Sequence, residues 1–284
     1  MISLKQRTLN ILDKYNLNAK KRLGQNFLID SSVVSRIVKE AGLDKDTGVI
    51  EIGPGIGSLT LELTSNAKKV LCYEIDLNMI QILNENINVD NLKIIEKDFL
   101  KADMQNDLSY FDDCKEIKVV SNLPYYITTP IVFKLLESDV DVSDFYFMVQ
   151  KEVGERFSGK VKTKDYNSLS VAIGFQADAK ILFNVNRSSF YPAPNVDSVI
   201  INVKKVDKGY DVKNKKDFLK FVQNIFAMRR KTLVNNINNS YNISKEEIIN
   251  ILKSLGHKEN VRSEELSVSE IVDLYNEIRG NSND

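Results

Sequence analysis

The sequence predicts an α/β protein with a mostly parallel seven-stranded sheet, helices on both faces of that sheet, and a small all-helical domain after it. Two observations predict the sheet: short apolar runs alternate with amphipathic stretches over residues 48–206, and the last two runs follow each other closely. A third observation predicts the second domain, because only helical patterns follow Val206. The polar segment 207–210 therefore marks a boundary, which divides the chain into residues 1–207 and 208–284.

The seven predicted strands share a short apolar core bounded by polar or turn-forming residues. They are residues 48–52, 69–74, 92–96, 117–121, 145–149, 180–185 and 198–206. Helical patterns separate most of the first five, which implies parallel strands joined by right-handed crossovers. The last two lie near each other in sequence, so we expect an antiparallel hairpin that completes one edge of the sheet.

The predicted helices have apolar positions three and four residues apart. In the first domain they include residues 58–66, 77–88 and 130–137. In the second domain, Ser244 and Ser267 are each followed three residues later by a glutamate. A hydroxyl and a glutamate at this spacing can satisfy each other's backbone N–H groups, so each serine is expected to begin a helix.

Composition limits the class of protein. The chain has 284 residues, 43% of them hydrophobic, which is enough for a large domain and a small one. It has no run of about 20 apolar residues that could span a membrane, and polar residues interrupt its N-terminus before a signal core can form. Cys72 and Cys114 lack the neighbours of a metal or disulfide motif. We expect a cytoplasmic protein with no metal and no membrane partner.

The formal net charge is zero, which argues mildly against a nucleic-acid partner. The basic residues are nevertheless clustered. The three runs are Lys14 with Lys20, Lys21 and Arg22; Lys160, Lys162 and Lys164; and Lys213 through Lys216, Lys220, Arg229, Arg230 and Lys231. A single run of this kind usually forms a solvated face, but three runs that flank one candidate site favour a polyanionic partner.

A glycine-rich turn, Glu51–Gly57, leaves the first predicted strand and enters a predicted helix. Gly53 and Gly55 allow the backbone to turn sharply and to approach a ligand without an intervening Cβ. A ligand-free connection is one alternative. A dinucleotide-binding turn is another, but its last glycine comes three residues after the second, whereas here the spacing is G-x-G-x-G. The spacing favours a nucleoside without a pyrophosphate.

Two acidic residues follow successive strands on the same edge of the predicted sheet. Glu74 ends the second strand, where a carboxylate can accept hydrogen bonds from both ribose hydroxyls. Asp98 follows the third strand and could accept a hydrogen bond from an adenine amino group. Each acid alone could be an ordinary surface residue; together with the glycine turn they predict a nucleoside-binding cofactor site.

The tetrapeptide Asn122–Tyr125 follows the fourth strand, at the same edge. Adenine N6 is a poor nucleophile because its lone pair is delocalised into the ring. The Asn122 side-chain oxygen and a neighbouring backbone carbonyl can accept the two N–H groups and draw the nitrogen toward tetrahedral geometry. Leu123-Pro124 stiffens the turn, and Tyr125 offers a face on which the base can stack.

The target base must be single-stranded or flipped out of a duplex to reach this turn. Phe190 lies in the proline-rich segment between the last two predicted strands, and its ring could close the other face of the base. From the residues alone, a core position for Phe190 is equally well supported.

At these motifs the chain resembles the KsgA family of small-subunit ribosomal RNA adenine dimethyltransferases, over residues 20–237. The segments that carry the resemblance are Lys21–Leu28, Glu51–Gly57, Tyr73–Asp76, Lys97-Asp98, Asn122–Tyr125, Gln150–Val153, Phe190–Ser198 and Phe226–Thr232. The resemblance implies a Rossmann-like class I methyltransferase fold that uses S-adenosylmethionine, with a C-terminal domain that helps to dock on the immature small subunit.

The resemblance also implies a role for individual residues. Asn26 and Leu28 would help to enclose the cofactor, and Gly53, Glu74, Asp98 and Asn122 would bind it, with Gly55 in the same turn. Asn122, Tyr125 and Phe190 would hold the adenine. The implied reaction adds two methyl groups to each of two adjacent adenosines near the 3′ end of 16S ribosomal RNA, during maturation of the subunit, and the enzyme would act as a monomer.

Two alternatives stay open. The Erm group, which dimethylates one adenosine of large-subunit RNA, shares nearly every cofactor motif, although the Leu23–Leu28, Val196–Ser198 and Arg229–Thr232 segments favour KsgA. The chain could also be a ribosome-assembly or RNA-binding factor whose methylation is dispensable. The intact glycine turn and Asn122 argue against a loss of activity.

Overall fold

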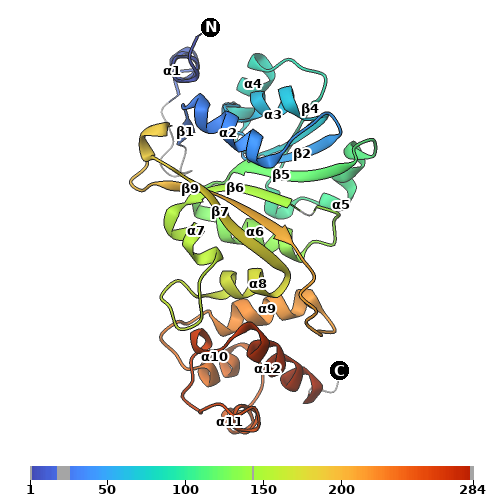
Figure 1. Cartoon of the computed structure of the whole chain (residues 1–284), viewed down its shortest axis with the longest axis vertical. Helices are drawn as coiled ribbons and strands as arrows, with labels where there is room; N and C mark the ends of the chain where they lie inside the picture. The colour runs from blue at the N-terminus through green and yellow to red at the C-terminus, as the bar shows by residue number, and fades with distance from the viewer. Residues whose placement is uncertain (1, 18–25, 143, 282–284) are drawn as a thin grey trace. The chain divides into compact units, whose positions relative to one another are not determined.

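The computed structural model of the chain describes residues 2–17, 26–142 and 144–281. Its central element is one seven-stranded sheet with the order β4-β3-β2-β5-β6-β9-β7 (Figure 1). The strands are β2 (Thr47–Ile52), β3 (Lys69–Glu74), β4 (Leu92–Glu96), β5 (Glu116–Asn122), β6 (Asp144–Gln150), β7 (Ala177–Val185) and β9 (Ser198–Lys205). All seven predicted strands are therefore confirmed, to within a few residues at each end.

The sheet is parallel through its first five strands. β2 pairs in parallel with β3 and β5, β3 with β4, and β5 with β6, whereas β9 pairs antiparallel with β6. The two late strands are neighbours at one edge, as expected, with β9 lying between β6 and β7. The sheet is thus doubly wound, with the carboxyl ends of β2, β3, β4 and β5 at one edge.

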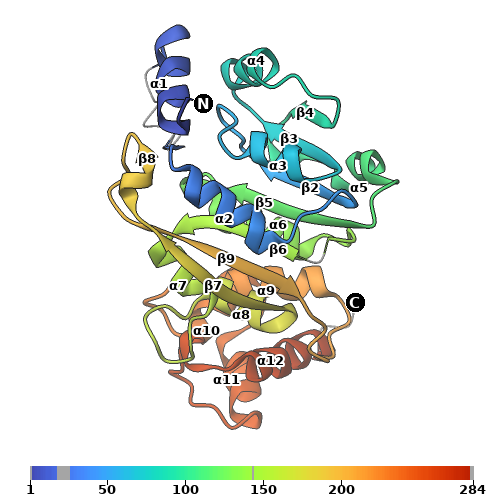
Figure 2. The ribbon, with the colours of Figure 1, turned by 45° about the horizontal axis from the view of Figure 1, so that its top comes forward.

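Both faces of the sheet are covered (Figure 2). Successive residues of a strand point to opposite faces, and Val49 and Ile50 of β2 are both fully buried. Val49 packs in a core cluster with Val34 and Ile37 of α2 and with Leu63 of α3. A strand that is apolar at consecutive positions is typical of a parallel sheet between two helical layers.

The helices follow the predicted pattern. In the order of the chain they are α1 (Leu4–Lys14), α2 (Ser31–Ala41), α3 (Thr60–Asn66), α4 (Leu77–Asn86), α5 (Met104–Asp107), α6 (Thr128–Glu137), α7 (Lys151–Phe157), α8 (Ser168–Gln176), α9 (Lys215–Ile225), α10 (Leu233–Ser240), α11 (Lys245–Ser254) and α12 (Val268–Asn281). Ser244 caps α11 by accepting from the Glu247 N–H group at 3.2 Å. At α12, Ser267 and Glu270 form the full reciprocal capping box.

A second, two-stranded sheet was not predicted. β1 (Phe27–Leu28) pairs antiparallel with β8 (Phe190–Tyr191), with Leu28 opposite Phe190. Both strands have only two residues, so neither has an alternation that a sequence pattern could reveal.

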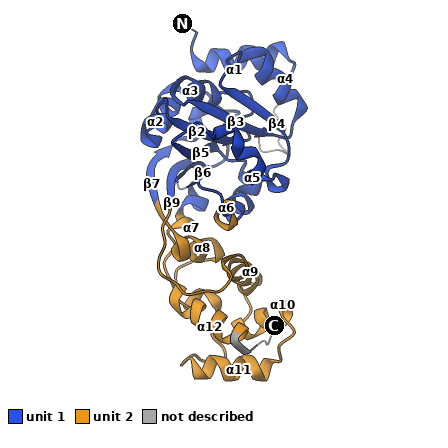
Figure 3. Ribbon diagram, turned by 90° about the vertical axis from the view of Figure 1, so that its right-hand side faces the viewer, with its two compact units in different colours: residues 1–134, 139–154, 180–204 blue, residues 135–138, 155–179, 205–284 orange. Residues whose placement is uncertain are grey.

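The chain divides into two compact units (Figure 3). Unit 1 contains residues 1–134, 139–154 and 180–204, and unit 2 contains residues 135–138, 155–179 and 205–284. The division at residue 204 lies close to the boundary inferred from sequence, and residues 155–179 group with the C-terminal helices. No described helix is long and apolar enough to span a membrane.

Candidate active site

A cavity of about 360 Å³ opens at the carboxyl ends of the four parallel strands β2, β3, β4 and β5. Its wall comes from the segment after each of these strands and from the residues around β1. The lining residues are Asn26–Leu28, Glu51–Ile56, Ser58, Leu59, Tyr73–Asp76, Met79, Lys97–Leu100 and Asn122–Ile127. The strand-end residues predicted from sequence, together with Asn26 and Leu28, therefore surround a single cavity.

The glycine turn requires backbone angles that other residues rarely adopt. Gly53 and Gly55 have φ values of 71° and 58°. A Cβ atom on Gly53 would also lie 3.2 Å from the ring of Pro124, in the turn after β5, so a side chain at this position would have to displace the proline slightly. The two glycines thus bring the backbone of the turn to the cavity wall.

Glu51 and Thr60 join the two ends of this turn. The Thr60 hydroxyl donates to the Glu51 carboxyl at 2.6 Å, and both side chains are buried. The Cys72 thiol also contacts the same oxygen, at 3.5 Å. Burial raises the pKa of Glu51 to about 7, because the charged form loses its hydration.

Glu74 links the end of β3 to the glycine turn. One carboxylate oxygen accepts from the Gly55 N–H group at 3.2 Å, and the other accepts from the N–H groups of Ile75 and Asp76 at 2.7 and 2.9 Å. Glu74 is 7% exposed, and burial raises the pKa of its carboxyl. The hydrogen bonds hold this carboxyl against the turn and in the cavity wall.

Asp98 begins the 3₁₀ turn Phe99–Lys101 by accepting from the Leu100 N–H group at 2.9 Å. The Lys134 ammonium, on α6, donates to the carbonyl oxygens of Leu100 and Ala102 at 3.0 and 2.7 Å. Lys134 thereby ties the turn after β4 to the helix that follows the β5 turn.

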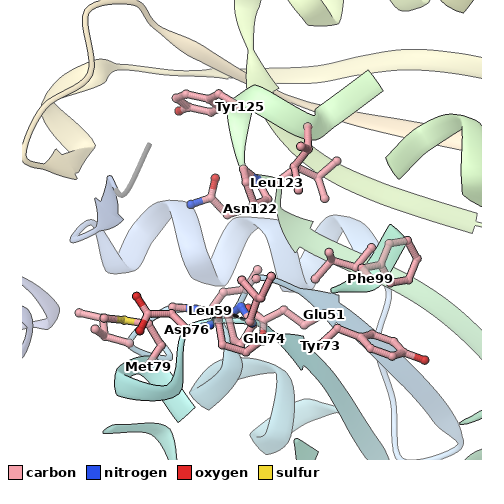
Figure 4. A pocket seen from close by; sticks show the side chains of 18 of the residues that line it. Glu51, Leu59, Tyr73, Glu74, Asp76, Met79, Phe99, Asn122, Leu123 and Tyr125 are labelled. Atoms are coloured by element: carbon pink, nitrogen blue, oxygen red, sulfur yellow. Dashed lines mark hydrogen bonds between the residues drawn. The ribbon is translucent and has the colours of Figure 1, made fainter. Parts of the chain in front are cut away.

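Asn122 is the last residue of β5 and pairs with Met148 of β6. The Leu123 N–H group donates to the Met148 carbonyl at 3.1 Å, and Leu123 is buried. The Pro124 carbonyl accepts from the Ile127 N–H group at 3.2 Å, which starts the 3₁₀ turn that leads into α6. In Figure 4, Asn122 lies between Tyr125 on one side and Glu74 and Asp76 on the other. These side chains all line the same cavity.

Tyr125 is held at its far end, because its hydroxyl lies 2.8 Å from the Ser198 hydroxyl. Burial raises the pKa of the Tyr125 phenol above its ordinary value, so the ring stays neutral at physiological pH.

The structure does not place Phe190 at this cavity. Phe190 is 2% exposed and packs with Leu28 in the core cluster that covers one face of the sheet. The β1–β8 pairing brings it beside Leu28, which does line the cavity. Its role as a stacking residue stays a prediction and would require the ring to turn outward.

The cavity also contains residues that are not predicted from the sequence. Tyr126, next to the predicted tetrapeptide, lines the cavity and is 56% exposed. Met79 of α4 packs with Phe27 and Ile56 in a cluster that Ile11 of α1 also joins. An N-terminal helix against the cavity wall leaves no local sequence signal, because its partners are far away along the chain.

The basic run near the N-terminus is only partly covered by the described residues. Lys14 forms an ion pair with Glu85 of α4 at 3.5 Å, whereas Lys20, Lys21 and Arg22 lie outside the described residues. Within the described ranges, no group of three or more His, Cys, Asp and Glu side chains could hold a metal ion.

The chain is similar to known ribosomal RNA methyltransferases over nearly its whole length. A family model described as "Ribosomal RNA adenine dimethylase" matches residues 16–279. Proteins named "Ribosomal RNA small subunit methyltransferase A" from Bacillus mycoides and Macrococcus caseolyticus are 45% and 43% identical, over 97% and 98% of this chain and 96% of each relative.

Solved structures agree. A dimethyladenosine transferase from Plasmodium falciparum is 26% identical, with a TM-score of 0.69 over 88% of this chain and 96% of that one. The 23S rRNA methyltransferase ErmE is 24% identical, with a TM-score of 0.58 over 89% of this chain and 100% of that one, which shows a shared fold.

Proposed function

Because the chain belongs to the ribosomal RNA adenine dimethylase family, we propose that it uses S-adenosylmethionine to dimethylate the N6 amines of two adjacent adenosines near the 3′ end of 16S ribosomal RNA. The names of the relatives support the small subunit as the target. The observation that carries the proposal is that Asn122–Tyr125 lines the same cavity as the glycine turn and the two strand-end acids. Cofactor and base can therefore meet at one place.

The cavity fits the proposed cofactor on two grounds. One is that its volume is within the range of small-molecule sites. The other is that its wall has an acid at the end of β3 and another after β4, suited to ribose hydroxyls and to an exocyclic amine. We propose that Asn26, Leu28, Gly53, Gly55, Glu74, Asp98 and Asn122 hold S-adenosylmethionine.

When bound, the cofactor would supply an electrophilic methyl group on a sulfonium. The protein's task is to present a nucleophile to it. The Asn122 side-chain oxygen and a backbone carbonyl of the Leu123-Pro124 turn would accept the two N–H groups of adenine N6 and localise the nitrogen lone pair. The bonds that fix Leu123 and Pro124 hold these acceptors in place before the base arrives.

The stacking residues would orient the base. Tyr125 offers a ring that is fixed at its hydroxyl, and the exposed Tyr126 stands beside it. Stacking of an unpaired base on an aromatic ring contributes about 1–3 kcal/mol to binding. We propose that Phe190 stacks on the face of the base opposite Tyr125, once its ring turns outward.

The basic residues of unit 2 would bind ribosomal RNA. Arg229 donates to the Lys164 carbonyl at 2.7 Å, so the second and third basic runs meet. Arg229, Arg230 and Lys231 are all exposed. We propose that unit 2, including the helices of residues 208–284, docks on the immature small subunit, and that the enzyme acts in the cytoplasm as a monomer.

The test of the proposed target is a choice between substrates. Purified protein with labelled S-adenosylmethionine is expected to label immature small subunits that lack the modification, and to leave large-subunit RNA unlabelled. Labelling of large-subunit RNA alone would favour the Erm-type reaction. Binding to small subunits without any transfer would favour a pure assembly factor.

A further inference from the structure

We propose that Ser198 is a positioning residue for methyl transfer: its hydroxyl holds the ring of Tyr125 at the place where the adenine stacks beside Asn122. The proposal rests on the proposed function and adds to it a residue of β9 that does not line the cavity. Its basis is the hydrogen bond of 2.8 Å between the two hydroxyls.

The Ser198 hydroxyl has a fixed place in the fold. Ser198 is the first residue of β9, is fully buried, and pairs with Gln150 of β6. The residue before it, Asp197, accepts from the Lys151 N–H group at 3.0 Å through its carbonyl and from the Arg187 N–H group at 2.9 Å through its carboxylate. The backbone at Ser198 is therefore held from both sides.

The sheet also fixes the spacing between Ser198 and Asn122. β6 is the common neighbour of β5 and β9, and it pairs Met148 with Asn122 and Gln150 with Ser198. Met148 and Gln150 are two residues apart, so they lie on the same face of β6. The strand register thus sets the amide of Asn122 and the hydroxyl of Ser198 at a constant offset.

Tyr125 needs such an anchor because its own backbone lies in a short 3₁₀ turn, Tyr125–Ile127. A tyrosine ring turns about two side-chain bonds. Rotation about Cα–Cβ swings the hydroxyl to a new place, so a hydrogen bond at the hydroxyl opposes that rotation and fixes the position of the ring. Ser198 is 73 positions away along the chain, so the contact ties the turn after β5 to β9, which lies two places from β5 in the sheet.

The test uses Ser198→Ala, Tyr125→Phe and the double variant. Each single change removes one partner of the same hydrogen bond and leaves a ring that can still stack. Because a neutral hydrogen bond of this kind contributes modestly, each is expected to lower kcat roughly 3- to 10-fold, with the KM for S-adenosylmethionine unchanged. The double variant is expected to be no slower than either single variant, since both changes remove one interaction.

The matched control is Thr47→Val, which removes another fully buried hydroxyl of unit 1, at the start of β2, where it donates to Asp44 at 2.7 Å. This variant is expected to lose stability but to keep the wild-type kcat. The substrate is the immature small subunit with labelled S-adenosylmethionine, and the unfolding midpoint is measured for every variant.

The outcomes are distinct. A wild-type kcat for Ser198→Ala, or losses that multiply in the double variant, would overturn the inference while the proposed function stands. A fall in kcat for Thr47→Val as large as that for Ser198→Ala would also overturn it, because stability alone would then explain the effect. Absence of transfer by the wild type would contradict the proposed function itself.

Discussion

Glu51 is a carboxyl group that is only 2% exposed, in the wall of the proposed cofactor cavity. Burial favours its protonated form, and the Thr60 hydroxyl bond offsets only part of that effect. The buried Glu51 side chain stabilises the glycine turn, because its hydrogen bond to Thr60 joins β2 to the start of α3. The same burial gives the protein a pH dependence that can be measured.

The change Glu51→Gln is expected to remove this pH dependence. The pKa of Glu51 is about 7 in the folded protein and near 4.5 when exposed, so the folded state binds an extra proton between these values. The wild type therefore loses stability as pH rises through this window and levels off above about pH 7, by roughly 3 kcal/mol in total. Glutamine stays neutral at every pH, so the variant does not show this fall in the free energy of unfolding.

The measurement is the free energy of unfolding of both proteins by urea between pH 4.5 and 8. Taking the difference between the two proteins cancels the titration of the groups that do not interact with Glu51. A difference that stays constant across this range would show that Glu51 titrates normally.

The glycine turn is the element in which sequence and packing agree most closely. Gly57, at its end, has a φ of 83°, and a Cβ there would lie 2.5 Å from Ile87 and 2.9 Å from Leu83, both buried. Gly42, after α2, has a φ of 56° but no atom within 4 Å of such a Cβ. Both glycines therefore have a backbone conformation that alanine rarely adopts, but only Gly57 lacks room for a Cβ atom.

Gly57→Ala and Gly42→Ala are therefore expected to differ. Gly42→Ala bears only the cost of a left-handed alanine, about 1–2 kcal/mol. Gly57→Ala adds the cost of displacing two packed side chains, about 1–3 kcal/mol more, and weakens cofactor binding. Chemical denaturation of both variants measures the difference in stability. Calorimetric titration with S-adenosylmethionine measures the weaker cofactor binding of Gly57→Ala. Equal losses of stability would contradict the packing argument.

The larger elements could be predicted from sequence because their signals are local. A run such as Val70-Leu71-Cys72 is apolar at every position because both of its faces are covered, and the strand ends then place Glu74 and Asp98 at one edge. Tertiary pairing leaves no such signal. The β1–β8 pair joins residues 27–28 to residues 190–191, and it buries Phe190 where the sequence alone left its position open.

The hydroxyl contact of Tyr125 is hidden from sequence for the same reason. Ser198 stands in a motif shared with the family, but the residue types do not show which side chain it meets. Only the register of β5, β6 and β9 brings the two hydroxyls together.

At the scale of the whole molecule, the zero net charge conflicts with an RNA partner only if the charges are spread evenly. They are not, since Arg229, Arg230 and Lys231 form an exposed run whose first member reaches Lys164. Changing all three to Ala is expected to weaken binding to small subunits. The slope of log K against the logarithm of the salt concentration should become less steep by about 2–3. Binding is measured at several salt concentrations.

Lys245, Lys253 and Lys258 provide the matched control, because they are exposed residues of the same unit and carry the same total charge. Their replacement by Ala is expected to have a much smaller effect on the slope. Equal slopes for the two triple variants would assign Arg229–Lys231 to an ordinary solvated surface.

Asn122 is proposed to make adenine N6 reactive at the edge of the sheet. The decisive measurement is mass spectrometry of 16S RNA from immature small subunits, after incubation with S-adenosylmethionine and either wild type or Asn122→Ala. The wild type is predicted to yield dimethyladenosine at two adjacent positions, and Asn122→Ala to be slower by at least 100-fold. Equal yields at equal rates would show that Asn122 does not activate the amine, and an unmodified adenosine pair with the wild type would show that the protein does not catalyse this reaction.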